Sequence, residues 1–597
     1  MTAESNVVYE FAGRRVDPLR RQLTHGGKPV VMFPRCFDAL LLLIEHRGEL
    51  LEKEFLLATL WPDVGVDENS LAKVISEVRR ALGEGPKEPG CIATVPRRGY
   101  RFTAPVEVRP AAAVTGGAFD DGQRREVRSL AVLPFTFLNP VASDESLGLG
   151  LADALITRLG QLRHTRVRPT SSIARFAAQS MAPAAAGRAL EVDAVITGTI
   201  RRAGSQVRVG VQLVAVRDDA VTWAERFDAE AAGALELEDS IAERVATALT
   251  LALARGERPP ETRRYTSNAD AYEHYIRARY LIAKRTREAL FAAIASLERA
   301  IAIDPAFALA HAGLSEAWIQ LGLRAAVSQS LRPREVMPKA RAAAEKALAI
   351  DESLSEAHSS LGQVLFTYEW KRDEGVRELL RAIDLNPNNQ NAQHWYAMSL
   401  AGLGRFDEAL VQIERAREID PLAVIVNANV GYVLYRAGRI EEAVTKLRHT
   451  VAMEPTFVMT RYRLGLALEA LKQYDEAIEQ FEAMRPSADD PLGWTGIARI
   501  RALMGQTDEA RRMLAQLQEI GRTLYVPAAT IADIYIALGD LERGMDYLEL
   551  AIEERAIIAM WVQWDWHWDP LRKLPRFATL LERTGLKGPP RDSRDRI

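Results

Sequence analysis

The chain has 597 residues, of which 48% are hydrophobic and 26% charged, the proportions of a globular protein and not of a disordered or fibrous one. Its 77 Lys and Arg nearly balance its 80 Asp and Glu, so the overall charge predicts neither a nucleic-acid partner nor a membrane surface, and any such preference must be local. At roughly 100 to 200 residues per domain, this length predicts about three to five domains.

Signals for export and for membrane anchoring are not found in the sequence. The start, MTAESNVVYEF, has neither the basic residues nor the apolar core of a secretory signal. The longest apolar runs fall far short of the roughly 18 to 20 residues that span a bilayer. Cys36 and Cys91 are too few for a disulfide framework or a four-ligand zinc site, so each is expected to be a small buried residue. These patterns predict a cytoplasmic protein without a membrane anchor.

Residues 1–107 form the first predicted domain. Apolar periodicity predicts helices over 33–48, 52–62 and 67–83. In the third helix an apolar stripe recurs at helical spacing and is expected to be buried; it consists of Leu71, Ile75, Val78 and Leu82. The opposite face is polar and carries Asn69, Lys73, Ser76, Glu77 and Arg80.

A hairpin with a basic tip is expected next. The strand patterns 91–95 and 99–106 flank Pro96, Arg97 and Arg98. From Arg79 to Arg101, six basic residues stand against two acidic ones. Three helices followed by such a hairpin are the plan of a winged helix, in which one helix fits the DNA major groove and the hairpin brings cations to the phosphate backbone or the minor groove.

The strings DENSLAKVISEVRRALG and IATVPRRGYRF resemble the OmpR/PhoB-type winged-helix domain over residues 7–107. Trp61, the pair Leu82 and Gly83, and the closing GYRF all stand where that family has them. The resemblance implies that 67–83 is a recognition helix for double-stranded DNA. The predicted DNA-binding residues on helix and wing are Asn69, Ser70, Lys73, Glu77, Arg79, Arg80, Arg97, Arg98 and Arg101.

Several of these assignments have alternatives. Arg79 is as well suited to an intradomain salt bridge as to a phosphate contact. Glu77 could accept from a cytosine amino group or pair with Lys73 on the preceding turn. Many members of the family have Arg or His where Asn69, Val74 and Ser76 stand here, so the operator sequence is not predicted. The family's response regulators carry a phosphoacceptor domain before this module, and CadC- and ToxR-type activators continue into a membrane span; this chain is expected to be a cytosolic relative without either.

Residues 108–128, rich in small and polar residues, are predicted to be a linker, and 129–257 an α/β domain. The strings SLAVLPF and VDAVITGTIRRAGSQVRVGVQLV resemble a TolB-like domain. Gly204 is expected to form a hairpin turn, and Trp223 to pack in the core. Neither a phosphate-binding loop nor a metal-binding or nucleophile motif is found in the sequence, so no catalytic residue, metal or cofactor is predicted.

Residues 270–558 repeat with a period of 34. GRFDEA and its variants begin at Gly404, Gly438, Lys472, Gly505 and Gly539, and Pro387, Pro421 and Pro455 recur at the same interval. Small residues at equivalent positions let two helices approach closely, and proline ends the second helix; this is the signature of tetratricopeptide repeats, about eight in number. The Trp-rich segment 559–588 is expected to cap the open end of the array, with a ligand site as the alternative.

The first helices of such repeats line a groove suited to a protein or peptide partner. The predicted groove residues, which include aromatic and Arg side chains of the kind that anchor interfaces, are Asn391, His394, Met398, Tyr432, Tyr435, Arg436 and Tyr462. The alternative for Met398 and Tyr435 is packing between neighbouring repeats.

The predicted fold is therefore multidomain: an α+β winged helix, an α/β TolB-like domain and an all-α repeat solenoid. The predicted function is a cytoplasmic one-component transcription regulator, acting as an activator, with RNA polymerase and a second copy of the chain as further candidate partners. The alternative is a repeat scaffold whose winged helix is a protein-docking module. An enzyme hidden in the middle domain is the third and least favoured hypothesis.

Overall fold

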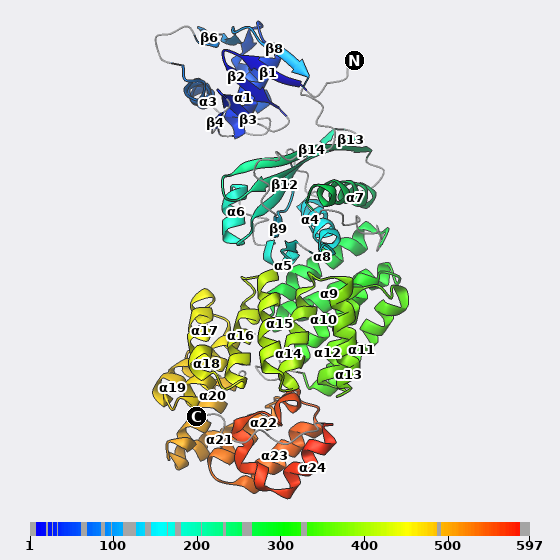
Figure 1. Ribbon diagram of the computed structural model, residues 1–597, viewed down its shortest axis with the longest axis vertical. Coiled ribbons are helices and arrows are strands. Elements are labelled where there is room, and N and C mark those ends of the chain that lie inside the picture. Colours follow the sequence, from blue (N-terminus) through cyan, green and yellow to red (C-terminus); the bar gives the residue numbers. More distant parts are fainter. Residues whose placement is uncertain are drawn as a thin grey trace. The chain divides into compact units, whose positions relative to one another are not determined.

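The computed structural model (Figure 1) divides into two compact units. The first comprises Met1–Arg125, Gly210–Val214 and Ala220–Phe227, and the second comprises Glu126–Val209, Ala215–Asp219 and Asp228–Ile597. The structure describes residues 7–18, 22–26, 28–30, 32, 34–60, 68–84, 90–96, 98–110, 127–137, 145–163, 165–173, 181–203, 206–230, 234–253, 266–323, 331–485 and 491–585.

Two small sheets and three helices make up the N-terminal domain. The first sheet has the order β4-β3-β2-β1-β8 and the second the order β5-β7-β6. The strands are β1 (Val7–Phe11), β2 (Arg14–Asp17), β3 (Gln22–His25), β4 (Lys28–Val30), β5 (Leu51–Glu52), β6 (Ile92–Val95), β7 (Gly99–Phe102) and β8 (Glu107–Pro110), and the helices are α1 (Pro34–Glu45), α2 (Lys53–Leu60) and α3 (Glu68–Ala81).

The three predicted helices of this domain and its hairpin are confirmed; α1 and α3 end two or three residues earlier than expected, and the predicted end of the second helix lies outside the described residues. The predicted stripe of α3 is at most 1% exposed and packs against α1. The last strand differs from the prediction, because β8 pairs with β1 as far as Pro110 and so extends into the range expected to be linker. Trp61 lies outside the described residues.

Both cysteines belong to the core of this domain, as predicted. Cys36 is 4% exposed and Cys91 is 8% exposed, and neither is in a disulfide. Burial raises the pKa of each thiol, and for Cys91 the neighbouring Glu84 raises it further. The protonated thiols therefore behave as small apolar groups and not as nucleophiles.

The middle domain is a mixed sheet with helices. Its strand order is β11-β9-β12-β13-β14, with β10 pairing with β12; β9 runs parallel to both β11 and β12. Trp223 is buried, as predicted, while Gly204 lies outside the described residues. The elements are β9 (Ser129–Val132), β10 (Thr136–Phe137), α4 (Glu145–Leu159), β11 (Arg166–Val167), α5 (Thr170–Ile173), α6 (Pro183–Ala189), β12 (Ala194–Ala203), β13 (Gln206–Ala215), β14 (Ala220–Glu230) and α7 (Ala234–Leu253).

Eight helix hairpins follow within the described residues, the number of repeats that the period predicts. The first helices of successive hairpins contact one another, so they form one continuous layer. The pairs are α8 (Ala269–Lys284) with α9 (Arg287–Ile303), α10 (Ala308–Leu323) with α11 (Pro333–Ile350), α12 (Ser355–Thr367) with α13 (Arg372–Leu385), α14 (Gln390–Gly402) with α15 (Phe406–Ile419), α16 (Val424–Arg436) with α17 (Ile440–Met453), α18 (Val458–Ala470) with α19 (Tyr474–Glu482), α20 (Leu492–Leu503) with α21 (Thr507–Ile520), and α22 (Ala528–Ala537) with α23 (Leu541–Glu553).

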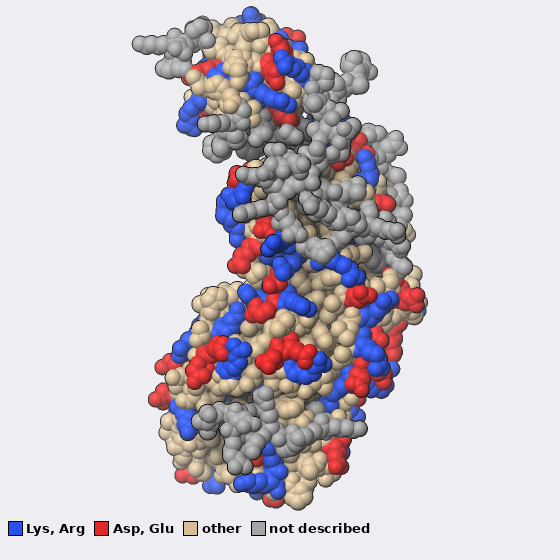
Figure 2. Space-filling view, in the orientation of Figure 1, with Lys and Arg blue, Asp and Glu red and all other residues tan. Residues whose placement is uncertain are grey.

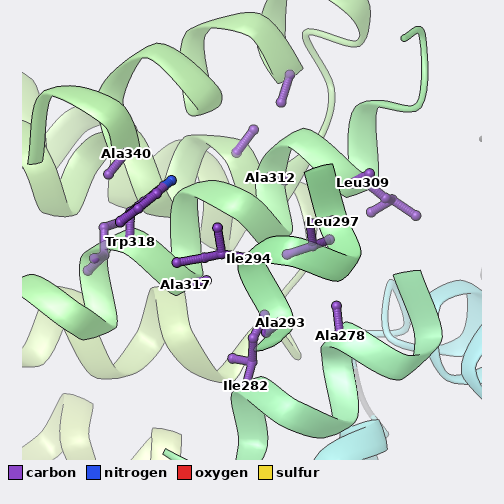
Figure 3. Packing of buried hydrophobic residues seen from close by; sticks show 14 of the residues in the cluster. Ala278, Ile282, Ala293, Ile294, Leu297, Leu309, Ala312, Ala317, Trp318 and Ala340 are labelled. Carbon is purple, nitrogen blue, oxygen red and sulfur yellow. The ribbon is translucent and has the colours of Figure 1, made fainter. Parts of the chain in front are cut away.

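Small residues bring the helices of the repeats together. Figure 3 shows Ala293, Ala312 and Ala317 among larger side chains such as Leu297 and Trp318 in the first two hairpins. Farther along, a Cβ atom at Gly431 would lie 2.5 Å from the Leu447 side chain. Interiors packed this closely leave no space for an added methyl group.

Proline ends the second helices where the sequence places it. Asn386, Asp420 and Glu454, which precede Pro387, Pro421 and Pro455, have φ near −140° and ψ near +90°. Extended backbone is the conformation that a following proline imposes. The second helix therefore stops at the same position in these three repeats.

The turns within the last five repeats each contain a residue with left-handed backbone. Gly404, Gly438, Gly505 and Gly539 have φ between 78° and 84° there, but Lys472 occupies the equivalent position with φ 60°. A side chain in this region costs roughly 1 kcal/mol relative to glycine.

We expect Lys472→Gly to raise the free energy of unfolding of the repeats by about 0.5–1 kcal/mol, measured as a shift of the urea midpoint. Lys472→Ala keeps the strained backbone and should show no such gain; equal gains from both would contradict this explanation.

Oppositely charged side chains are interleaved over the repeat helices on the face that Figure 2 shows. Ion pairs one turn apart, such as Arg405 with Glu408 and Arg439 with Glu442, account for part of this pattern. Because water and salt screen exposed pairs of this kind, each contributes little to stability. Among the described helices, none is both long enough and apolar enough to cross a bilayer.

Candidate DNA interface and repeat cavity

The polar face of α3 is accessible. Lys73 and Ser76 are exposed, and the Arg80 side chain is 74% exposed. Glu77 pairs with Arg80 on the next turn and not with Lys73 on the preceding one. Ser70 is half-buried, and nothing is described of the Asn69 side chain. Because the apolar stripe fixes the rotation of α3, these polar side chains share the face opposite the core.

Arg79 points back into the domain. Its Nη2 donates to the carbonyl of Ile92 at 2.8 Å and to the Thr94 hydroxyl at 2.7 Å, and its Nε lies 3.9 Å from Glu84. The guanidinium thus connects α3 to strand β6 of the wing. Of the two predicted roles for Arg79, the intradomain contact is the one present in the structure.

The wing is a tight hairpin with exposed cations. Val95 pairs with Gly99, which puts Pro96 and Arg98 at the tip. The Arg98 side chain is 66% exposed and lies 3.9 Å from Glu52, and Arg101 is exposed on β7. Arg97 lies outside the described residues. A Cβ atom at Gly99 would stand 1.9 Å from the Leu51 carbonyl, so only glycine allows β5 to pair with the wing.

A cavity of about 870 Å³ lies in the second unit, lined by the first helices of the repeats and by residues of α4 and α5. Six of the seven predicted groove residues line it: Asn391, His394, Met398, Tyr432, Arg436 and Tyr462. Tyr435 does not. It is 2% exposed, and its hydroxyl accepts from the Trp566 indole at 2.8 Å. The packing alternative holds for Tyr435, while Met398 faces the cavity.

Several of the predicted groove residues already have partners within the chain. Arg436 is only 3% exposed and lies 2.6 Å from the Asp565 carboxylate. The Asn391 amide donates to Glu316 at 2.8 Å, and His394 contacts the amide of Asn429. The prediction of Arg436 as an interface anchor is therefore corrected, because a guanidinium buried on a carboxylate is not available to a partner.

The C-terminal segment only partly resembles the predicted cap. Helix α24 (Pro575–Arg583) packs on α23, the last repeat helix. The two 3₁₀ helices before it, η3 (Ile557–Trp561) and η4 (Trp566–Lys573), also contact α23, but η3 reaches α12 as well, the first helix of the third repeat. Trp564 donates to the Gly402 carbonyl at 2.9 Å, and Trp568 to Asp533 at 2.7 Å. Indole rings bury a large apolar area and bring one donor each, so this segment fills part of the predicted groove.

A buried network of charges joins this segment to the repeats. His567 lies 2.9 Å from Asp565 and 3.4 Å from Glu469, which is also bound by Arg499. Burial would raise the pKa of Asp565, but Arg436 and His567 outweigh it and hold that pKa well below its usual range. Burial and Arg499 oppose the charged form of His567, yet Asp565 and Glu469 raise its pKa to about 9.

This network predicts a pH dependence. Because the pKa of His567 is about 9 in the folded chain and near 6.5 when unfolded, its contribution to stability is fully present below pH 6.5 and is lost as the pH rises through 9. We expect the urea midpoint of the repeats to fall between about pH 6.5 and 9.5, and His567→Gln to flatten this dependence. His449→Gln, at an exposed position of α17, is the matched control. A steep decrease that survives in His567→Gln would assign the titration to another group.

The middle domain is docked on the repeats through polar contacts that are buried or partly buried. The Arg168 guanidinium donates to the carbonyls of Glu418 and Ile419 at the end of α15, at 2.8 and 2.7 Å. The Asn388 amide donates to three carbonyls of the middle domain, those of Gly160, Leu162 and Thr165. The cavity lies next to these contacts, since Gly160 and Asn388 both line it.

Family models match three parts of the chain. Residues 27–102 match "Transcriptional regulatory protein, C terminal", and residues 126–244 match "HilA/YgeH-like transcriptional regulator, second domain". Tetratricopeptide models match 371–424, 431–491 and 529–556. The chain therefore carries a winged-helix domain of the predicted type and the predicted repeats, and the middle domain matches a regulator domain; its resemblance to TolB stays a prediction.

Curated relatives match over parts of their length. A putative adenylate cyclase 3 of Rhizobium meliloti is 27% identical over 187 residues, 31% of this chain and 32% of the relative. The transcriptional activator CadC of Escherichia coli is 34% identical over 92 residues, 15% and 18% of the two chains. The transcriptional regulator HilA of Salmonella typhimurium is 34% identical over 133 residues, 22% of each. The matches span about a third or less of each relative.

Proposed function

We propose that this chain is a one-component transcription regulator whose winged helix binds double-stranded DNA. The observation that carries the proposal is the exposure of Lys73 and Arg80 on α3 together with that of Arg98 on the wing. A helix and a hairpin that expose cations on one small domain suit the major groove and the adjacent phosphates. Asn69, Ser70, Glu77, Arg97 and Arg101 complete the proposed interface.

The repeat cavity and the docked middle domain are the proposed input region. Polar contacts of Arg168 and Asn388 hold the two together, so a ligand or partner at the cavity would act on both. Activation is proposed in preference to repression because CadC bears the name of an activator. RNA polymerase and a second copy of the chain are proposed partners, the latter because one winged helix offers a small interface. The proposed location is the cytoplasm, and no catalytic activity is proposed.

The test is binding of the full chain to genomic fragments at several salt concentrations. A regulator should select a few fragments, with an affinity that falls linearly with salt on logarithmic axes. Footprinting of the selected fragments would then give the operator. Equal, weak binding to every fragment would favour the scaffold hypothesis, in which the winged helix docks a protein.

A further inference from the structure

Three arginines on the first helices of consecutive hairpins line the repeat cavity: Arg436 on α16, Arg463 on α18 and Arg499 on α20. Two of them are neutralised within the chain. Arg436 lies 2.6 Å from Asp565, and Arg499 binds Glu469 and lies 3.5 Å from Asp533. These two pairs show how this interior accommodates a guanidinium, namely with a buried carboxylate against it.

Among the described residues, no carboxylate forms an ion pair with Arg463. Its guanidinium carbon lies 4.8 Å from the centre of the Tyr432 ring, the same distance as that of Arg436. Its Nη1 atom is buried, and across the described part of the chain no acceptor or carboxylate pairs with it. Burial lowers the pKa of Arg463 to about 10, and the nearby Arg436 contributes to the decrease. A desolvated cation next to another cation is unfavourable unless an anion compensates it.

The surroundings of Arg463 suit an organic molecule. Trp395, Met398, Met459 and Tyr462 line the same cavity and supply apolar and aromatic walls. Burial and the positive charges of Arg285 and Arg463 lower the pKa of His394 to about 3, so the imidazole is neutral near pH 7. The volume of about 870 Å³ lies within the range of small-molecule sites, roughly 300–1,000 Å³.

We propose that Arg463 binds the carboxylate or phosphate group of a small organic anion, whose apolar body packs against Met398 and Tyr462. The guanidinium offers a planar pair of donors that matches either group. Residues of α5, including Thr170 and Ser172, line the same cavity, so the proposed site and the middle domain share this space. Binding does not depend on the proposed function; only the role of the anion as the regulatory signal rests on it.

Thermal melting of the full chain tests this site. Phenyl phosphate and benzoate are the anionic probes and benzyl alcohol the neutral one, all at constant ionic strength. An anion at about a hundred times its dissociation constant should raise the wild-type melting temperature by about 3 °C or more, and the alcohol should not. Arg463→Gln should lose this response and, without a probe, melt no lower than the wild type, since it removes an uncompensated charge.

Two further variants make the result specific. Arg461→Gln, on the same helix but outside the cavity lining, should respond as the wild type does. Arg463→Lys keeps the charge but lacks the paired donors, so it should respond about tenfold more weakly; it replaces Arg463→Gln if that variant does not fold. A larger response to phenyl phosphate assigns a phosphate ligand, and a larger response to benzoate a carboxylate.

The proposal is wrong if neither anion stabilises the wild type, or if Arg463→Gln responds equally. DNA binding measured on the same preparations separates the two proposals. Intact binding to selected fragments without an anion response rejects the anion site alone. An anion response without DNA binding rejects the regulator and leaves the site in place.

Discussion

Replacing Arg80 and Arg98 together by alanine is expected to weaken DNA binding on the order of tenfold or more at about 0.1 M salt and to flatten its salt dependence. For each phosphate that the variant no longer neutralises, the slope of log affinity against log salt should decrease by about 0.9. Both side chains are largely exposed, at 74% and 66%, and neither is needed for the core. The measurement is fluorescence anisotropy of a labelled fragment from about 50 to 300 mM salt.

The matched control is the double variant Arg15→Ala with Arg109→Ala. These two side chains are also exposed, at 49% and 59%, but lie on the five-stranded sheet and not on α3 or the wing. The control makes the same change in net charge, so it should leave the slope nearly unchanged. If both double variants lower the slope equally, the arginines act only through the overall charge of the domain, and the proposed interface is wrong.

Asp565→Ala is expected to destabilise the repeats by roughly 3–5 kcal/mol, because it leaves Arg436 as a buried cation without its carboxylate. The two groups are each 3% exposed and 2.6 Å apart. Urea unfolding of the full chain followed by tryptophan fluorescence measures the effect, since Trp561, Trp564, Trp566 and Trp568 belong to the segment that this pair holds.

Two variants distinguish the effect of the buried charge from that of packing. Asp565→Leu combined with Arg436→Met removes both charges. This double variant should regain much of the free energy of unfolding that is lost in Asp565→Ala. Glu408→Ala breaks an exposed, solvent-screened pair with Arg405 and should leave the urea midpoint nearly unchanged. If the double variant is as unstable as Asp565→Ala, packing of the segment and not its charge would be the main cause.

Local patterns in the sequence were sufficient for most of the helices. The stripe of Leu71, Ile75, Val78 and Leu82 predicts the buried face of α3, because helical spacing puts these residues on one side whatever they pack against. The prolines at 387, 421 and 455 predict the ends of the repeat helices, because their effect on the preceding residue is local. The matches to a winged-helix family and to tetratricopeptide models rest on the same kind of pattern.

Pairings between distant residues could not be predicted in this way. The sequence position of Arg79 is equally compatible with a phosphate and with an internal partner, and only the fold brings β6 beside it. The first sheet brings β8 back to β1 across nearly the whole domain, and no local pattern encodes that pairing.

What the sequence alone determined about this protein is its division into modules and the secondary structure within them, since periodicity, proline positions and turn residues act over a few residues. Only the tertiary structure decided which polar side chains can bind DNA or a partner and which are already paired within the chain. Asp565 lies 129 positions after Arg436, yet it neutralises that residue, while among the described residues no carboxylate pairs with Arg463. The physical reason is that the free energy of burying a charge depends on every group that lies near it in space. Groups that are far apart in the sequence leave no local pattern that would predict such a contact.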